Sequence, residues 1–153
     1  MNIESTLSEG INILKKNKIS NPQLDSEILL SNSIKRDKKY IILNPKESLN
    51  SAQSKKFKSL IERRKKGEPV AYLINKKEFW KYEFFVNRDV LIPRPDTELI
   101  IEQVLKIYSK ISHMQVLDIG TGSGCILLSI LKERPNFYGT GIDISKKSIN
   151  VSK

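Results

Sequence analysis

The chain has too few cysteine and histidine residues for several common kinds of site. Its 153 residues include a single cysteine, Cys125, and a single histidine, His113. One cysteine excludes an internal disulfide and fits a reducing compartment. One Cys and one His cannot supply a zinc site, so we expect no bound metal. No base is evident that would activate the thiol, and Cys125 is therefore expected to be a small packing residue.

Long hydrophobic runs are also missing. No stretch is apolar enough to span a membrane, and Met1-Asn-Ile-Glu-Ser-Thr-Leu7 lacks the basic region and apolar core of a secretory signal. The composition, with 39% hydrophobic and 29% charged residues, is typical of a soluble globular protein. We therefore expect a cytoplasmic protein with no membrane partner.

Basic residues are concentrated in the first part of the chain. Residues 1–88 hold 19 Lys and Arg against 10 Asp and Glu, whereas residues 89–153 hold 8 against 7. This difference indicates two units. The basic excess is compatible with a face for an acidic protein or nucleic acid. We favour solvated helix surface, because no aromatic residues interleave with the charges, and nucleic acid is the less favoured partner.

An apolar strand that runs into three alternating glycines is the most informative stretch. Val116-Leu-Asp-Ile-Gly-Thr-Gly-Ser-Gly124 predicts a short buried strand of a parallel sheet followed by a tight loop. Asp118 would lie near the carboxyl end of that strand, where open α/β sheets bind their ligands. Glycines can adopt positive φ and let a ligand lie directly against the main chain. The run from Ile126 to Leu131 predicts a helix whose first amides face the same crevice.

A second predicted strand ends in another carboxylate. Tyr138-Gly-Thr-Gly-Ile-Asp143 places Asp143 about 20 residues past the loop, where a ribose-binding acid belongs. This acid indicates a nucleoside ligand. A dinucleotide fingerprint would need Gly or Ala at position 125, where Cys125 stands. The pattern present is D-x-G-x-G-x-G.

The first 72 residues carry helical patterns. Apolar residues recur at helical spacing between candidate caps, which predicts a small helical bundle whose last helix ends near Gly67. The predicted helix starts are a capping box of Thr6 and Glu9, Asn21 before Pro22, Asp37, and Asn50 or Ser51.

The pattern changes period after this bundle. Glu78-Phe-Trp-Lys-Tyr-Glu-Phe-Phe-Val86 is aromatic and partly alternating, which predicts a hairpin with its turn at Lys81 and Tyr82. The prolines of Val90-Leu-Ile-Pro-Arg-Pro-Asp-Thr-Glu98 forbid a helix until Asp96 or Thr97 caps the segment that starts at Glu98.

Four segments together resemble a known family, and they are Gly67-Glu-Pro-Val-Ala-Tyr-Leu73, Glu78-Phe-Trp80, Leu91-Ile-Pro-Arg-Pro-Asp-Thr-Glu98 and Val116 to Gly124. They look like the signature segments of the HemK or PrmC family, whose members use S-adenosylmethionine to methylate a glutamine side-chain amide in peptide chain release factors. Asn75 and Lys81 depart from the family pattern, because glycine is expected at both positions, although Asn tolerates the left-handed region.

The resemblance implies an α+β fold and a set of site residues. It implies a helical substrate-recognition domain over residues 1–72, a β-hairpin linker over 73–92, and an incomplete Rossmann-like methyltransferase domain over 93–153. The loop would face the methionine moiety, Asp118 would orient the loop or the amino group, and Asp143 would bind the ribose. The implied cofactor-binding residues are Asp118, Gly120, Thr121, Gly122, Ser123, Gly124 and Asp143, with Arg94, Pro95 and Thr97 as candidate neighbours of the cofactor.

One family motif is missing. The Asn-Pro-Pro-Tyr segment, which holds the substrate amide, does not occur in the sequence. We therefore expect the chain to be an N-terminal fragment without catalytic residues, and to be inert alone. Two alternatives stay open. One is a nucleic-acid amino-group methyltransferase of the same fold, and the other is an inactive fragment that binds release factors.

Overall fold

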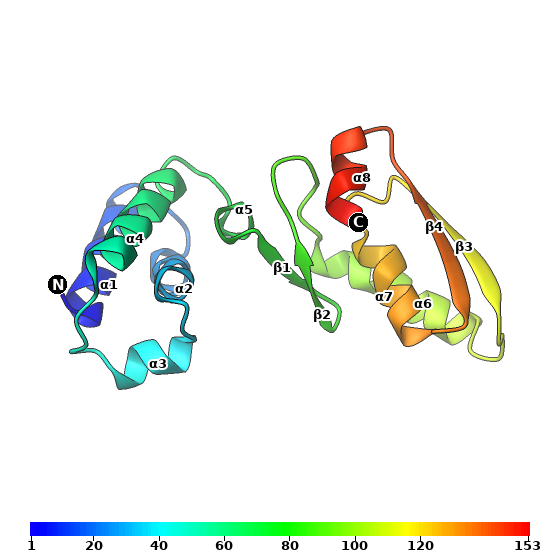
Figure 1. Ribbon diagram of the computed structural model, residues 1–153, viewed down its shortest axis with the longest axis horizontal. Coiled ribbons are helices and arrows are strands. Elements are labelled where there is room, and N and C mark those ends of the chain that lie inside the picture. Colours follow the sequence, from blue (N-terminus) through cyan, green and yellow to red (C-terminus); the bar gives the residue numbers. More distant parts are fainter. The chain divides into compact units, whose positions relative to one another are not determined.

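The computed structural model describes residues 1–153 and divides into two compact units, Met1–Ile74 and Asn75–Lys153. Helices make up the first unit, whereas the second combines helices with two small sheets (Figure 1). This mixture confirms the predicted α+β class. The roles given to residues 1–72, 73–92 and 93–153 stay predictions, because compactness assigns no role.

Five helices enclose the core of the first unit. Their buried side chains form one cluster in which Leu14, Leu29, Leu30 and Phe57 are each at most 2% exposed. Burying such a side chain contributes about 1.5–3 kcal/mol. The apolar stripes therefore pack as the predicted bundle. The helices are α1 (Ile3–Lys16), α2 (Pro22–Ile34), α3 (Lys38–Leu43), α4 (Ser51–Arg64) and α5 (Val70–Ile74).

Two of the predicted caps hold the starts of α3 and α4. The first amides of a helix have no partner within it, and a side-chain oxygen at the cap satisfies one of them. Asp37 accepts a hydrogen bond from the Tyr40 amide (2.8 Å), and Asn50 accepts one from the Gln53 amide (2.9 Å). Both caps confirm the sequence prediction.

The first helix starts earlier than predicted. Asn2 and Ser5 form its capping box, so the predicted box of Thr6 and Glu9 is wrong. Both pairs fit the capping pattern, and pairing outside the helix decides between them. The amide of Ile3 donates to the Glu47 carbonyl, and Asn2 forms a β-bridge with Ser48.

A hairpin opens the second unit. Strands β1 (Lys76–Phe79) and β2 (Tyr82–Phe85) pair antiparallel, with Phe79 opposite Tyr82. The turn residues are Trp80 and Lys81, one position earlier than predicted, because Tyr82 is already the first residue of β2.

Two residues of this region adopt the left-handed conformation. Asn75 has φ of 55° and Trp80 has φ of 57°. Asparagine tolerates this region, which explains how Asn75 replaces the glycine expected there. A tryptophan is far less suited to it, so Trp80 needs support from its surroundings. At Lys81, the other position where glycine is expected, φ is not positive.

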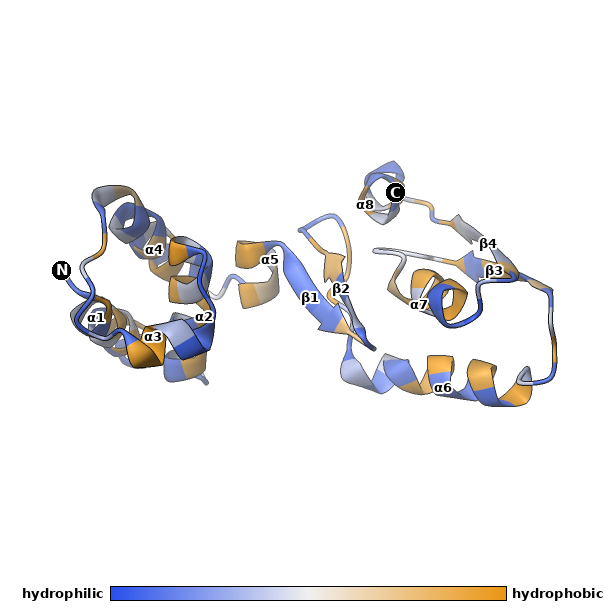
Figure 2. Ribbon diagram, turned by 60° about the horizontal axis from the view of Figure 1, so that its bottom comes forward, coloured by the Kyte–Doolittle hydropathy of each residue, from blue (hydrophilic) through white to orange (hydrophobic).

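A strand, helix and parallel strand form the rest of the second unit. Strands β3 and β4 place Ile119 opposite Ile142, so their carboxyl ends meet at one edge. Figure 1 shows α6 and α7 on the same side of these strands, and Figure 2 shows hydrophobic and hydrophilic residues alternating along α6. The elements are the 3-10 helix η1 (Pro95–Thr97), α6 (Glu98–Ile107), β3 (Met114–Ile119), α7 (Cys125–Glu133), β4 (Phe137–Ile142) and α8 (Lys146–Ser152).

One face of this sheet is covered and the other is exposed. Val116 and Phe137 pack in the core of the unit, whereas Leu117 and Ile119 are 59% and 75% exposed. Successive side chains of a strand point to opposite faces, so one face can be buried alone. The predicted strand is confirmed, and it is buried on one face only, because the helices pack against that face alone.

Candidate functional site

The glycine loop joins the end of β3 to the start of α7. The amides of Gly120 and Thr121 donate to the Ile142 carbonyl at the end of β4, over 2.8 and 3.0 Å. Gly120, Gly122 and Gly124 have φ of 80°, 55° and 77°, in the region that favours glycine. The loop therefore turns sharply while it stays attached to the neighbouring strand.

Open space lies in front of this loop. A Cβ atom built on Gly120 would meet nothing within 4 Å, and one on Gly122 would meet only the Gly120 carbonyl oxygen at 3.9 Å. Gly124 differs, since its Cβ would lie 3.0 Å from the Leu128 side chain. Gly124 thus allows close packing of the helix start, whereas the other two glycines leave room for a ligand against the main chain.

The carboxylate of Asp143 lies against the same loop. Its Oδ2 atom accepts a hydrogen bond from the Gly122 amide (3.0 Å), and its Oδ1 atom accepts one from the Ser145 amide (2.8 Å). The structure thus brings the end of the second parallel strand and the glycine loop into direct contact. Spacing in the sequence predicted only that both lie at the same edge of the sheet.

A second carboxylate supports the loop from β3. The Thr121 hydroxyl, which is buried, donates to Asp118 Oδ2 over 2.9 Å. Asp118 is therefore in contact with the loop, and its role toward a cofactor stays a prediction. Asp118 and Asp143 contact neighbouring residues of the loop, so two carboxylates lie beside it.

The proline segment before α6 has a less defined relation to the loop. Arg94 and Pro95 are exposed, and Thr97 is half-buried. Neither Arg94 nor Thr97 caps its helix with a side-chain hydrogen bond. Contact of this segment with a cofactor stays a prediction.

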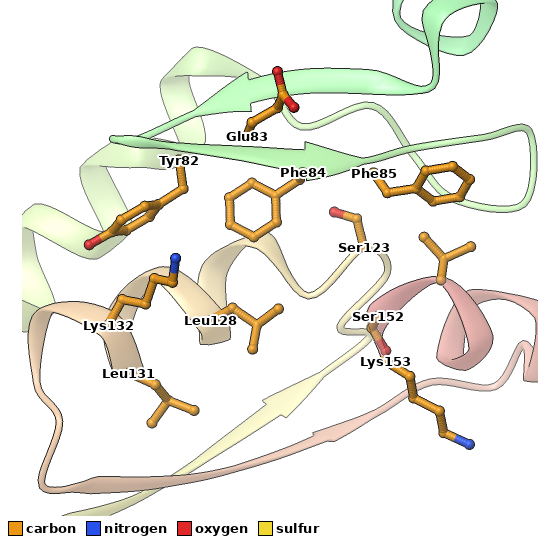
Figure 3. Close-up of a pocket in the computed structure, with 11 residues that line it drawn as sticks. Tyr82, Glu83, Phe84, Phe85, Ser123, Leu128, Leu131, Lys132, Ser152 and Lys153 are labelled. Atoms are coloured by element: carbon orange, nitrogen blue, oxygen red, sulfur yellow. The ribbon is translucent and has the colours of Figure 1, made fainter.

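A mostly apolar cavity of roughly 390 Å³ lies between β2 and the helices α7 and α8 (Figure 3). Ser123 is buried and is the only predicted site residue that lines this cavity. Cys125 follows it at the start of α7, where burial raises the pKa of the thiol. A protonated, buried thiol fits the predicted packing role.

Sequence reasoning missed a carboxylate that holds the hairpin turn. Glu133, at the end of α7, accepts hydrogen bonds from the indole nitrogen of Trp80 (2.9 Å) and the hydroxyl of Tyr82 (3.1 Å). The Lys81 ammonium lies 3.0 and 3.1 Å from its two oxygens. Three consecutive hairpin residues therefore bind one side chain more than 50 positions later in the chain.

A second carboxylate explains the unusual backbone of Trp80. The Trp80 amide donates to Glu98 Oε1 over 2.8 Å. Glu98 begins α6 and is the last residue of the proline segment. Together Glu98 and Glu133 stabilise the left-handed conformation of Trp80. No local pattern signals this arrangement, because both contacts join segments that are distant in sequence.

The contacts of Glu133 predict a response to acid. The Lys81 ammonium, with the indole N–H of Trp80, holds the pKa of Glu133 below its ordinary value. A lowered folded-state pKa stabilises the fold above the unfolded-state value, and this stabilisation is lost as pH falls through the folded-state pKa. We expect the hairpin turn to loosen below about pH 4.3, the ordinary pKa of glutamate.

Fluorescence can follow this change, because Trp80 is the only tryptophan. An acid titration of the wild type should show a transition that Glu133→Gln lacks. Identical acid transitions in the two proteins would contradict the assignment to Glu133.

The structure contains no group of three or more His, Cys, Asp or Glu side chains that could hold a metal ion. None of its helices combines the length and the apolar character that a membrane crossing requires.

Comparison with known proteins agrees with these features. The model of the PrmC N-terminal domain family matches residues 5–74. A release factor glutamine methyltransferase of Coxiella burnetii is 39% identical over 132 residues, which cover 86% of this chain and 48% of that relative. Another, from Buchnera aphidicola subsp. Baizongia pistaciae, is 41% identical over 152 residues, which cover 99% of this chain and 54% of that relative.

A larger relative shows the same similarity. A bifunctional methyltransferase of Rickettsia bellii is 37% identical over 177 aligned positions, covering 99% of this chain and 32% of that protein. The chain thus spans between about a third and about half of the length of these curated relatives. The family resemblance predicted from the sequence is confirmed. Residues 5–74 match the PrmC N-terminal domain family, and the chain as a whole is similar to release factor glutamine methyltransferases over about half of their length.

Proposed function

We propose that this chain provides the cofactor-binding part of an S-adenosylmethionine-dependent methyltransferase that acts on a glutamine side-chain amide of peptide chain release factors. One observation carries the cofactor assignment: the Asp143 carboxylate contacts a glycine loop that has open space in front of it. When bound, S-adenosylmethionine would supply a methyl group on a cationic sulfur. The names of the relatives support the substrate.

The hydrogen-bonding capacity of Asp143 fits a ribose. A carboxylate offers about four lone-pair sites. Two are used by the amides of Gly122 and Ser145, one on each oxygen. One site on each oxygen therefore remains for the two ribose hydroxyls. Asp143 can bind a ribose while it keeps the loop in place.

Charge favours this cofactor over a dinucleotide. A pyrophosphate binds to free amides of such a loop and at the start of the following helix. Here the Gly122 amide is already bonded to Asp143, and the carboxylate would repel a phosphate. S-adenosylmethionine carries no phosphate, and its sulfonium and amino groups are cationic. The carboxylates of Asp118 and Asp143 therefore select for it.

No residue of this chain receives a catalytic role. An amide nitrogen is a weak nucleophile because its lone pair is delocalised, so the rate should depend on aligning it with the methyl group. The Asn-Pro-Pro-Tyr segment that holds the amide in the family does not occur in these 153 residues. The contribution of this chain is to bind and orient the cofactor.

We assign substrate recognition to the helical unit. Because this unit is basic, a nucleic-acid substrate stays an alternative. Several of its basic side chains, however, already form ion pairs with carboxylates. Arg63 pairs with Glu68, Arg64 with Asp25 and Lys65 with Glu62. Three of the four basic residues from Arg63 to Lys66 are thus partly neutralised within the unit, which favours a protein partner over nucleic acid.

Replacing Asp143 with alanine tests the cofactor site. Loss of hydrogen bonds to a charged partner costs about 1.5–3 kcal/mol, so the dissociation constant for S-adenosylmethionine should rise about 10- to 100-fold. Isothermal titration calorimetry measures this change. The exposed carboxylate of Glu102, on α6, provides a matched control, since Glu102→Ala should bind as the wild type does. Unchanged affinity in Asp143→Ala would contradict the ribose assignment.

Labelled cofactor separates the proposed substrate from the alternatives. Methyl transfer should be measured to purified release factor and to nucleic acid, for this chain and for a chain extended by a family-type Asn-Pro-Pro-Tyr segment. We expect this chain to be inert and the extended chain to label the release factor. Labelling by the 153-residue chain itself would show that its own residues complete the catalytic site.

A further inference from the structure

A chain of hydrogen bonds leads from the glycine loop to the start of the proline segment, residues 89–98. Asp143 contacts the loop amide of Gly122 and the amide of Ser145, which caps α8. The Ser145 hydroxyl accepts a hydrogen bond from the Ser148 amide (3.2 Å). The Ser148 hydroxyl in turn donates to the carbonyl oxygen of Asp89 over 2.9 Å.

Ser148 occupies an unusual place for a helical serine. It is 5% exposed, and its hydroxyl bonds to a backbone group 59 positions away and not to its own helix. An apolar residue of similar size would fill the same volume. The hydroxyl therefore serves to fix the backbone at Asp89 against the helix that follows Asp143.

The other end of the proline segment is also fixed. Glu98 accepts the hydrogen bond of the Trp80 amide, and Glu133 at the end of α7 binds the Trp80 indole. Helix α7 starts at the glycine loop, and α8 follows Asp143. The segment is thus attached at its start to α8 and, through Trp80, at its end to α7, and these are the two helices that follow the proposed cofactor residues. Its middle, from Leu91 to Arg94, has no regular structure of its own.

We propose that Ser148 and Glu98 are positioning residues, which hold residues 89–98 in place beside the S-adenosylmethionine site. This inference rests on the proposed function. Ser148 sets the start of the segment relative to Asp143, and Glu98 sets its end relative to the hairpin turn. Arg94, Pro95 and Thr97 lie between these attachments, so their positions depend on both.

Backbone relaxation of the ligand-free protein tests the positioning directly. In the wild type, the amides of Val90, Leu91 and Arg94 should have order parameters near the rigid value of about 0.85. Ser148→Ala should lower them below about 0.6, the range of flexible backbone. Ser148→Thr keeps the hydroxyl and should restore the rigid values. Ser152→Ala is the matched control, because the Ser152 hydroxyl bonds only to its own helix at Ile149.

Affinity for S-adenosylmethionine tests the link to the site. Ser148→Ala should raise the dissociation constant about 3- to 10-fold, the equivalent of one net hydrogen bond. Ser148→Thr and Ser152→Ala should stay within about twofold of the wild type. Glu98→Ala should weaken binding similarly, whereas Glu98→Gln, which keeps an acceptor oxygen, should not. The two Glu98 variants test the proposal independently if a change at position 148 prevents folding.

The outcomes separate the two proposals. If the wild type does not bind S-adenosylmethionine, the proposed function fails, even where relaxation shows that Ser148 orders the segment. If the wild type binds and the segment loosens in Ser148→Ala without any loss of affinity, Ser148 is structural only and the inference is overturned. An unchanged segment in both Ser148→Ala and Glu98→Ala would overturn it as well.

Discussion

Gly122→Val should abolish binding of S-adenosylmethionine. The Cβ of residue 122 points into the open space in front of the loop, where the ligand is expected to lie on the main chain. Residue 122 also has φ of 55°, which a β-branched side chain adopts only with strain. Calorimetry should detect no binding, which corresponds to a loss of more than about 100-fold, or at least 2.7 kcal/mol.

Gly67→Val is a control that separates the effect of blocking the cofactor site from the effect of backbone strain. Gly67 also has positive φ, of 91°, and a Cβ built there would meet nothing within 4 Å. It lies in the helical unit, outside the proposed cofactor site. Gly67→Val should therefore carry comparable strain and still bind the cofactor. Retained binding in Gly122→Val would mean that the ligand does not lie on this loop.

Phe57→Ala should be the most destabilising change in the helical unit. Phe57 is 2% exposed, and its ring fills the space left by Gly10, whose Cβ would lie 2.6 Å from the ring. Truncation leaves a cavity between α1 and α4 and should cost about 3–5 kcal/mol. Chemical denaturation followed by circular dichroism should show that Phe57→Ala loses its helices at a lower denaturant concentration than the wild type. The exposed Lys55→Ala on the same helix should change stability by less than about 0.5 kcal/mol.

The same experiment also tests how separate the two units are. The only tryptophan, Trp80, belongs to the second unit and reports its unfolding by fluorescence. We expect the fluorescence transition of Phe57→Ala to stay near that of the wild type. A fluorescence transition that moves together with the circular dichroism would show that the units unfold as one.

Local patterns in the sequence predicted the elements of the site well. The apolar run at Val116 predicted β3, and the segment from Tyr138 to Asp143 predicted β4. The alternating glycines predicted the turn between β3 and α7, because such a turn depends on neighbouring residues. Asp143 could be placed near the loop since parallel strands bring their carboxyl ends to one edge. Its hydrogen bond to Gly122 is a finer result that only the folded chain provides.

Features that depend on contacts between distant segments could not be predicted from the sequence. The start of α1 at Ile3 depends on backbone pairing with residues 45–48, and no capping pattern contains that information. Glu133 looks like an ordinary acidic residue near a helix end, yet it binds the hairpin turn. The spacing of Ser145 and Ser148 after Asp143 signals a helix cap, but the bond from Ser148 to Asp89 has no local signature.

A backbone NMR titration with S-adenosylmethionine tests the central claim most directly, namely that the cofactor binds on the glycine loop beside Asp143. The largest amide shift changes should occur at Gly120, Gly122 and Gly124 and at residues 142–145, and they should saturate. Asp143→Ala should require a far higher ligand concentration for the same changes. Saturable shifts confined to other parts of the chain, or no shifts at millimolar cofactor, would contradict the account.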